Sequence, residues 1–189
     1  HTQPAGPEIV TASAPVIEVD GRLFKNSSGS GTLLPYEDWR LDADARARDL
    51  ASRLSIEQIA GLMLYSPHQL VPFEGRGPFT ASYGGRPFAE AGVPPWALTD
   101  EQRRMLGEDH IRHVLLMTVS DAAVAARWNN ELQALAESLP FGVPVNTSRD
   151  PRNGPAETAE EVKSAAVSVS HWPEGPGMAA LFSPEAGYE

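Results

Sequence analysis

Apolar residues recur at helical spacing early in the chain. Between residues 44 and 54 they stand three or four positions apart: Ala47, Leu50, Ala51 and Leu54. Ser55 is followed three places later by Gln58, which is the pattern of a capping box. The two signals predict a helix over 44–54 and a second, short helix from about residue 56 towards Gly61.

Two further helices are predicted by the same signals. Thr99 and Gln102 form another capping box, and Gly107 is placed to end the short helix that follows. Ser120 is the expected N-cap of the longest helix, whose apolar positions are spaced by four, four, three and four residues: Val124, Trp128, Leu132, Leu135 and Leu139. Such a stripe must pack against another element.

Three apolar runs read as strands. They are Leu62–Tyr65, His113–Val119 and Phe141–Thr147. The second is uniformly apolar, which is typical of a parallel strand covered on both faces. The order strand, helix, strand predicts right-handed β/α units and an α/β fold. About three strands are too few to close a parallel barrel, which takes eight strands and about 250 residues.

The remaining segments are long connections rich in glycine and proline. Residues 1–34 are predicted to be an irregular arm, and Lys25–Thr32 is expected to be mobile because it has almost nothing to bury. Residues 66–98 show no clean period, and a loop of that size is usually functional. An ordered α/β domain is expected over 35–189.

Charge and composition exclude several classes of function. The chain has 189 residues, with 15 Lys and Arg against 25 Asp and Glu, a net charge of −10 and no cysteine. The acidic balance disfavours nucleic acid as a partner. No apolar run approaches the roughly 20 residues of a membrane span. Without cysteine there is no disulfide, thiolate metal site or cysteine nucleophile. The chain begins at His1, so we expect a processed or shortened product.

Five segments together resemble glycoside hydrolase family 3, the β-glucosidase and β-xylosidase type. In the order that the family would place them, they are Pro35–Leu41 (PYEDWRL), Ala47–Met63 (ARDLASRLSIEQIAGLM), Arg127–Glu137 (RWNNELQALAE), Gly142–Gly154 (GVPVNTSRDPRNG) and His171–Glu185 (HWPEGPGMAALFSPE). The resemblance implies that the chain is the N-terminal portion of a TIM-type (β/α)8 barrel, which an α/β sandwich domain follows. It also implies hydrolysis of terminal, non-reducing β-linked sugars in a secreted or periplasmic setting.

The resemblance further implies that the catalytic groups lie elsewhere. Such enzymes are retaining and use two carboxyl groups roughly 5 Å apart, one as nucleophile and one as acid/base. Both family positions would fall beyond Glu189, so we expect no catalytic residue in this chain. The implied partners are a β-glucoside or β-xyloside and the remainder of the same enzyme, with no cofactor, nucleic acid or membrane. A natural short homologue is the less favoured alternative, because a half-barrel would expose strand edges.

Asp150 and Arg152 are the candidate substrate-binding residues. Asp150 follows the strand predicted over 141–147, at the edge where β/α barrels build their sites. By its match to the family motif it resembles a carboxylate that accepts hydrogen bonds from hydroxyls of the terminal sugar. From spacing alone, a turn aspartate is the more common reading. Arg152 is expected to orient Asp150, or else to form a structural ion pair. Asn153 stands where the family usually has His, so no titratable role is expected there.

No metal site is expected. Proteins similar to this one often carry a calcium-loop-like pattern in this region, and the corresponding positions here are Asn26, Ser28, Ser30, Gly31 and Glu37. Glu37 is the only carboxylate among them, whereas hard cations favour several anionic oxygens. The five histidines lack metal-binding spacing.

Two other readings of the whole chain remain. One is a catalytically inert, carbohydrate-binding or scaffolding relative of the same fold. The other is a small α/β binding domain whose resemblance reflects core packing alone. Six aromatic residues near the long loop could stack on a sugar acceptor or could simply pack: Tyr65, Phe73, Phe79, Tyr83, Phe88 and Trp96.

Overall fold

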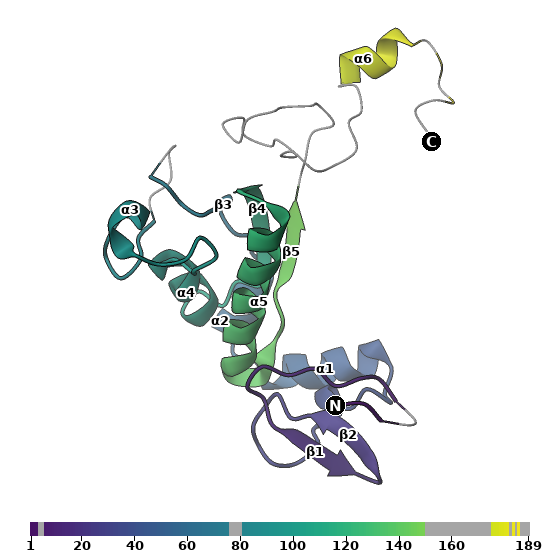
Figure 1. Ribbon diagram of the computed structural model, residues 1–189. Coiled ribbons are helices and arrows are strands. Elements are labelled where there is room, and N and C mark those ends of the chain that lie inside the picture. The colour runs from purple at the N-terminus through teal and green to yellow at the C-terminus, as the bar shows by residue number, and fades with distance from the viewer. Residues whose placement is uncertain (4–5, 76–80, 150–174, 182, 184, 186–189) are drawn as a thin grey trace.

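The computed structural model describes residues 1–3, 6–75, 81–149, 175–181, 183 and 185 (Figure 1). Its elements, in chain order, are β1 (Val16–Val19), β2 (Arg22–Lys25), the 3-10 turn η1 (Pro35–Glu37), α1 (Ala43–Arg53), α2 (Ile56–Leu62), β3 (Gln69–Val71), α3 (Phe88–Ala91), α4 (Asp100–Gly107), β4 (His113–Val119), α5 (Ala122–Ser138), the 3-10 turn η2 (Pro140–Gly142), β5 (Asn146–Arg149) and α6 (Gly175–Ala180). The predicted helices α1, α2, α4 and α5 and the predicted strand β4 are confirmed.

A three-stranded parallel sheet forms the centre of the molecule, in the order β3-β4-β5. The β4 strand lies in the middle because it is the most apolar of the three, with Val114, Leu116 and Val119 buried. Between β4 and β5 the chain crosses over through α5, which gives one β/α unit (Figure 1). The α/β class predicted from the sequence is therefore confirmed at the level of a mixed fold with a small parallel sheet.

The hydrophobic core lies between this sheet and the helices α4 and α5. Trp128 and Leu132 of α5 and Leu106 of α4 are fully buried there. The predicted apolar stripe of α5 thus faces the core. The N-cap of α5 is Asp121 and not Ser120 as expected, because the Asp121 carboxylate accepts a hydrogen bond of 2.9 Å from Val124 N–H. A carboxylate here also complements the positive end of the helix.

Two strand predictions were wrong. Leu62 ends α2, and the side chains of the next three residues are 82%, 53% and 53% exposed: Met63, Leu64 and Tyr65. These residues have apolar character but no covering element among the described residues. The strand predicted over 141–147 begins later in the structure. Phe141 has a φ of 66° inside η2, and the strand β5 starts only at Asn146. The left-handed backbone at Phe141 cannot continue a strand.

The arm over residues 1–34 is not irregular throughout. β1 and β2 pair as an antiparallel hairpin whose turn contains Asp20 and Gly21, both with positive φ. Phe24 of β2 is fully buried and stacks on Trp39 with ring centroids 5.3 Å apart. The hairpin was not predicted, although Asp20-Gly21 between two short strand-like runs is its local signal.

The arm is fastened to the C-terminal end of α5 through Glu137. The Oε1 atom accepts hydrogen bonds of 2.7 Å from three successive backbone N–H groups: Ala12, Ser13 and Ala14. The same oxygen accepts from Thr11 Oγ1, and Oε2 pairs with Lys25 Nζ at 2.6 Å. Figure 1 shows the hairpin beside α1 at this end of α5.

A buried cation fixes the start of β5. Arg112 donates hydrogen bonds to the carbonyl oxygens of Leu106, Ile111 and Val143. Burial lowers the pKa of the Arg112 guanidinium, which nevertheless stays charged because its ordinary pKa is so high. The side chain therefore ties the end of α4 to the segment that leads into β5.

Candidate functional site

The carboxyl ends of the parallel strands meet at one edge of the sheet. Val71 pairs with Val119 there, and Ser120 N–H donates a hydrogen bond of 3.1 Å to Val71 O. On the other side, Arg149 ends β5 opposite Leu116. In parallel α/β folds this edge is where sites are built.

The two candidate substrate-binding residues, Asp150 and Arg152, lie outside the described residues, as do Asn153 and His171. Arg149 is the last described residue of β5, so Asp150 directly follows the carboxyl end of an observed parallel strand. The strand begins and ends later than predicted, so Asp150 follows it directly and not after two further residues. The role of the Asp150 and Arg152 side chains stays a prediction.

The loop that follows β3 at this edge is held by buried aromatic groups. Phe73 N–H donates a hydrogen bond of 2.9 Å to Tyr83 Oη, and both side chains are buried. Burial raises the pKa of the Tyr83 hydroxyl, although the bond from Phe73 opposes that rise. Tyr83 also contacts Phe88, with ring centroids 5.5 Å apart. The described part of the loop is thus a packed structure.

The acidic start of α4 supports the same loop. Asp100 accepts hydrogen bonds from the backbone N–H groups of Gly84 and Gly85, and from Ser82 Oγ. These three donors lower the pKa of the Asp100 carboxyl, with the bond from Gly85 as the largest cause. Glu101 accepts from Ser82 N–H at 2.9 Å. These contacts to Asp100 and Glu101 keep the loop against α4.

The sheet face turned away from α5 carries a row of polar side chains. Thr147 points towards α5, where its hydroxyl donates to Asn129 Oδ1 at 2.9 Å. Because side chains alternate along a strand, Asn146 and Ser148 point to the opposite face. There Asn146 Nδ2 lies 3.2 Å from His113 Nδ1, and Ser148 hydrogen-bonds the hydroxyl of Tyr65.

Tyr65 and His113 complete this row. Their rings stack with centroids 6.4 Å apart, and a parallel bridge joins the two residues. Tyr65 was predicted to lie in a buried strand, so this row was not expected from the sequence. Residues 146–149 (Asn-Thr-Ser-Arg) are all polar, and this was the signal for a polar face on the strand.

The other aromatic residues that could have formed a sugar platform mostly pack internally. Trp96 packs against the core, with the guanidinium of Arg127 4.4 Å from its ring centroid. Phe73, Tyr83 and Phe88 stabilise the loop after β3 as described. Phe79 lies outside the described residues. For these four described side chains the packing alternative holds, and Tyr65 alone is largely exposed.

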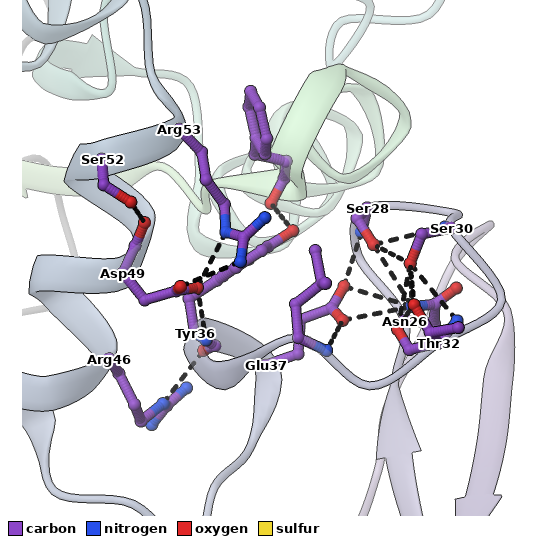
Figure 2. A network of polar contacts seen from close by, with 12 residues as sticks. Asn26, Ser28, Ser30, Thr32, Tyr36, Glu37, Arg46, Asp49, Ser52 and Arg53 are labelled. Atoms are coloured by element: carbon purple, nitrogen blue, oxygen red, sulfur yellow. Dashed lines mark hydrogen bonds and ion pairs between the residues drawn. The ribbon is translucent and has the colours of Figure 1, made fainter.

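A second polar cluster lies in the loop between β2 and η1 (Figure 2). The Glu37 carboxylate accepts hydrogen bonds from Ser28 N–H at 2.7 Å and Leu34 N–H at 3.0 Å. Asn26 is only 1% exposed and Glu37 7%. The loop over 25–32, expected to be mobile, is therefore secured at a buried anchor. No group of three or more His, Cys, Asp or Glu side chains in the described part of the chain is placed to hold a metal ion.

The turn η1 joins this loop to the domain. Tyr36 N–H donates to Asp49 Oδ2 at 3.1 Å, and Tyr36 O accepts from Arg46 Nε at 3.0 Å (Figure 2). The Tyr36 hydroxyl donates to Phe141 O. Burial, with the neighbouring charge of Glu37, raises the pKa of this hydroxyl, so it stays protonated. Helix α1 and η2 thus fix the position of the Glu37 carboxylate.

No helix among the described residues is long and apolar enough to cross a membrane. A scan against protein-family models found no match. A search of curated proteins, in contrast, identifies the chain as a relative of β-glucosidases. The resemblance to glycoside hydrolase family 3 is supported by these relatives over the part of their length that the chain covers.

The relatives include an enzyme named periplasmic beta-glucosidase/beta-xylosidase from Dickeya chrysanthemi, 35% identical over 179 residues, which cover 93% of this chain. A probable beta-glucosidase C from Aspergillus oryzae is 29% identical over 150 residues, and beta-glucosidase C from Emericella nidulans is 29% identical over 151. The matches span 24% of the Dickeya protein and 21% of each fungal protein. The chain thus covers about a quarter or less of these relatives.

Proposed function

We propose that this chain is the N-terminal part of the (β/α)8 barrel of a retaining, exo-acting β-glycosidase. The reaction is hydrolysis of terminal, non-reducing β-linked glucose or xylose. One observation carries the proposal: 93% of the chain matches a protein named beta-glucosidase/beta-xylosidase. The location named for that relative also supports a periplasmic or secreted setting.

The sheet fits the part of a barrel that the proposal assigns to it. In a barrel, helices cover the outside and the strands turn their other face to the interior. Here α5 covers one face, while Tyr65, His113, Asn146 and Ser148 occupy the other. Parallel sheets are normally covered on both faces, so the remaining strands of the barrel would enclose this row.

Asp150 is proposed to bind the terminal sugar, with Arg152 orienting it. A carboxylate has two acceptor oxygens, which can bind two adjacent hydroxyl groups and hold the sugar in place for attack. The nucleophile and the acid/base are proposed to lie in polypeptide beyond residue 189. In such an enzyme this chain contributes substrate orientation and no bond-breaking group.

The test compares two proteins on nitrophenyl β-glucoside and β-xyloside. One is the 189-residue chain, and the other is the product of the same coding sequence continued beyond residue 189. We expect no turnover from the short chain and turnover from the longer protein. Hydrolysis by the short chain would contradict the placement of the catalytic carboxylates. An inactive longer protein that still binds glucose would instead identify an inert, carbohydrate-binding relative.

The role of Asp150 is tested in the longer protein by Asp150→Asn, with the exposed Asp44→Asn as control. Loss of hydrogen bonds to sugar hydroxyls is expected to lower kcat/KM by at least 100-fold, about 3 kcal/mol. Glucose should raise the melting temperature of the parent protein and of the control, but not that of Asp150→Asn. Equal protection of all three proteins would rule out Asp150 as a sugar ligand.

A further inference from the structure

Five oxygen atoms surround the side-chain nitrogen of Asn26. The distances from Nδ2 are 3.0 Å to Thr32 O, 3.1 Å and 3.3 Å to the two carboxylate oxygens of Glu37, 3.3 Å to Ser28 Oγ and 3.5 Å to Ser30 Oγ. Figure 2 shows these contacts converging on Asn26. An amide nitrogen has two hydrogen atoms, so it cannot donate a full hydrogen bond to each of five acceptors.

The spacing of the five oxygens is that of a calcium loop. In a twelve-residue calcium loop the ligands come from positions 1, 3 and 5, from the backbone carbonyl of position 7 and from a bidentate Glu at position 12. With Asn26 as position 1, positions 3, 5, 7 and 12 are Ser28, Ser30, Thr32 and Glu37. Position 6, which needs glycine for a sharp turn, is Gly31, with a φ of 76°.

The orientation of the Asn26 amide is fixed by its other end. Gly31 N–H donates a hydrogen bond of 2.8 Å to Asn26 Oδ1. Turning the amide over would place its NH2 group against this N–H, so two donors would face each other. The nitrogen must therefore point towards the five oxygens.

We propose that the loop over 26–37 has the form of a divalent-cation site in which the amide nitrogen of Asn26 takes the place of the ion. The loop is consequently held together without metal. An aspartate at position 26 would keep the bond from Gly31 and replace the donating nitrogen by a carboxylate oxygen, which repels the Glu37 carboxylate unless a cation binds between them. Asn26→Asp therefore converts the loop into a Ca²⁺ site with six oxygens, two carboxylates among them. The proposal does not depend on the glycosidase function.

The experiment measures Ca²⁺ binding by calorimetry in the 189-residue chain and its variants, together with melting in EDTA and in calcium chloride. The parent chain should bind no Ca²⁺ below about 1 mM, and its melting temperature should be the same in both buffers. Asn26→Asp should bind at least ten-fold more tightly than the parent. Its melting temperature should be lower in EDTA, because two carboxylates then face each other, and should rise again with Ca²⁺.

Two matched variants make the result specific. Asn130→Asp adds the same charge at an exposed position of α5 and should bind no Ca²⁺. Adding Ser30→Ala to Asn26→Asp removes one cage oxygen and should weaken binding several-fold. Tight binding by the parent chain would overturn the proposal, because the ion would then displace the amide. Failure of Asn26→Asp to bind, or to refold when Ca²⁺ is added, would overturn it as well.

Discussion

The Glu137 carboxylate accepts more hydrogen bonds than the carboxylate of Asp100 or of Glu101, the two acids described near the sheet edge. Burial alone would raise its pKa, but hydrogen bonds from Ala14 N–H, the Lys25 ammonium and the Thr11 hydroxyl outweigh that effect. The pKa of Glu137 therefore lies well below its ordinary value near 4.3. Three successive N–H groups around one anion form the kind of backbone nest that proteins use to bind anions. Here the bound anion is a side chain of the same molecule.

Glu137→Gln is expected to destabilise the fold by about 2 kcal/mol at pH 7, because the substitution removes the charge and turns a donor towards Lys25. A carboxyl with a lowered folded-state pKa contributes stability above its unfolded pKa and loses it as pH falls. The difference between parent and variant should therefore be full at pH 7 and shrink below about pH 4.3. Urea unfolding at pH 7 and at pH 3 measures both values.

The control is Glu131→Gln, an exposed acid on the same helix, which should change stability by less than about 0.5 kcal/mol. An equal loss from both variants would assign the effect to the net charge of the molecule. A loss from Glu137→Gln that does not change with pH would contradict the proposed role of its ionised carboxylate.

At the scale of elements, α2 and α4 begin with the same capping box in different surroundings. The Ser55–Gln58 pair of α2 is on the surface, whereas Thr99 and Gln102 of α4 are buried. Gln102 Oε1 accepts from Thr99 N–H at 3.0 Å and from Trp128 Nε1 at 3.3 Å. The second box therefore links the start of α4 to the core.

Thr99→Ala is expected to lower the free energy of unfolding by about 2 kcal/mol, which is at the high end for an N-cap residue. The reason is that Gln102 N–H loses its acceptor in a buried position. Ser55→Ala should cost about 0.5–1 kcal/mol, since water can solvate the released group. Chemical denaturation of the two variants side by side gives the comparison. If the two substitutions lower the free energy of unfolding equally, burial of the cap residue does not determine how much it stabilises the helix.

Elements with strong local signals could be predicted from the sequence, and those defined by tertiary contacts could not. The helices have capping boxes or a continuous stripe, as in α5, so local patterns suffice. The hairpin has a local signal in its Asp20-Gly21 turn, but its packing depends on Phe24 stacking on Trp39. The position of β5 depends on pairing with β4. Neither contact is visible in a single sequence.

The candidate site could also be predicted only in part. That Asp150 lies just after a strand was predicted, although the apolar run over 141–145 that suggested the strand precedes β5, whose own four residues are polar. The polar residues of β5 were visible in the sequence, but the row of Tyr65, His113, Asn146 and Ser148 was not, because it is assembled from three segments that only the sheet brings together. The residues of the calcium-like loop were visible in the sequence. The position of the Asn26 amide at the centre of this loop could be seen only in the structure.

At the scale of the whole molecule, α2 presents an apolar surface. Gly61 faces the backbone of Asp109 and His110 so closely that a Cβ atom would lie 2.4 Å from Asp109 O. Away from this contact, Ile56 is 78% exposed and Met63 82%. The two residues are seven positions apart and so lie on one side of the helix. The proposed barrel would supply a partner that covers them.

Replacing Ile56 and Met63 together by Gln is expected to reduce the binding of a hydrophobic dye to the 189-residue chain, with little change in melting temperature, because neither side chain is in the core. Fluorescence titration and thermal melting measure the two properties. Val10→Gln, which changes a 71% exposed residue on the arm, is the matched control and should reduce dye binding less. A drop of several degrees for the double variant would show that the two side chains are packed.

The fastening of the arm to Glu137 also bears on how the protein is made. The bonds from residues 11–14 to Glu137 join positions 123 to 126 residues apart in the chain. During translation at about 5–20 residues per second, on the order of 10 s separates the emergence of the arm from that of its acceptor. The arm therefore stays unsecured until the end of α5 has been synthesised.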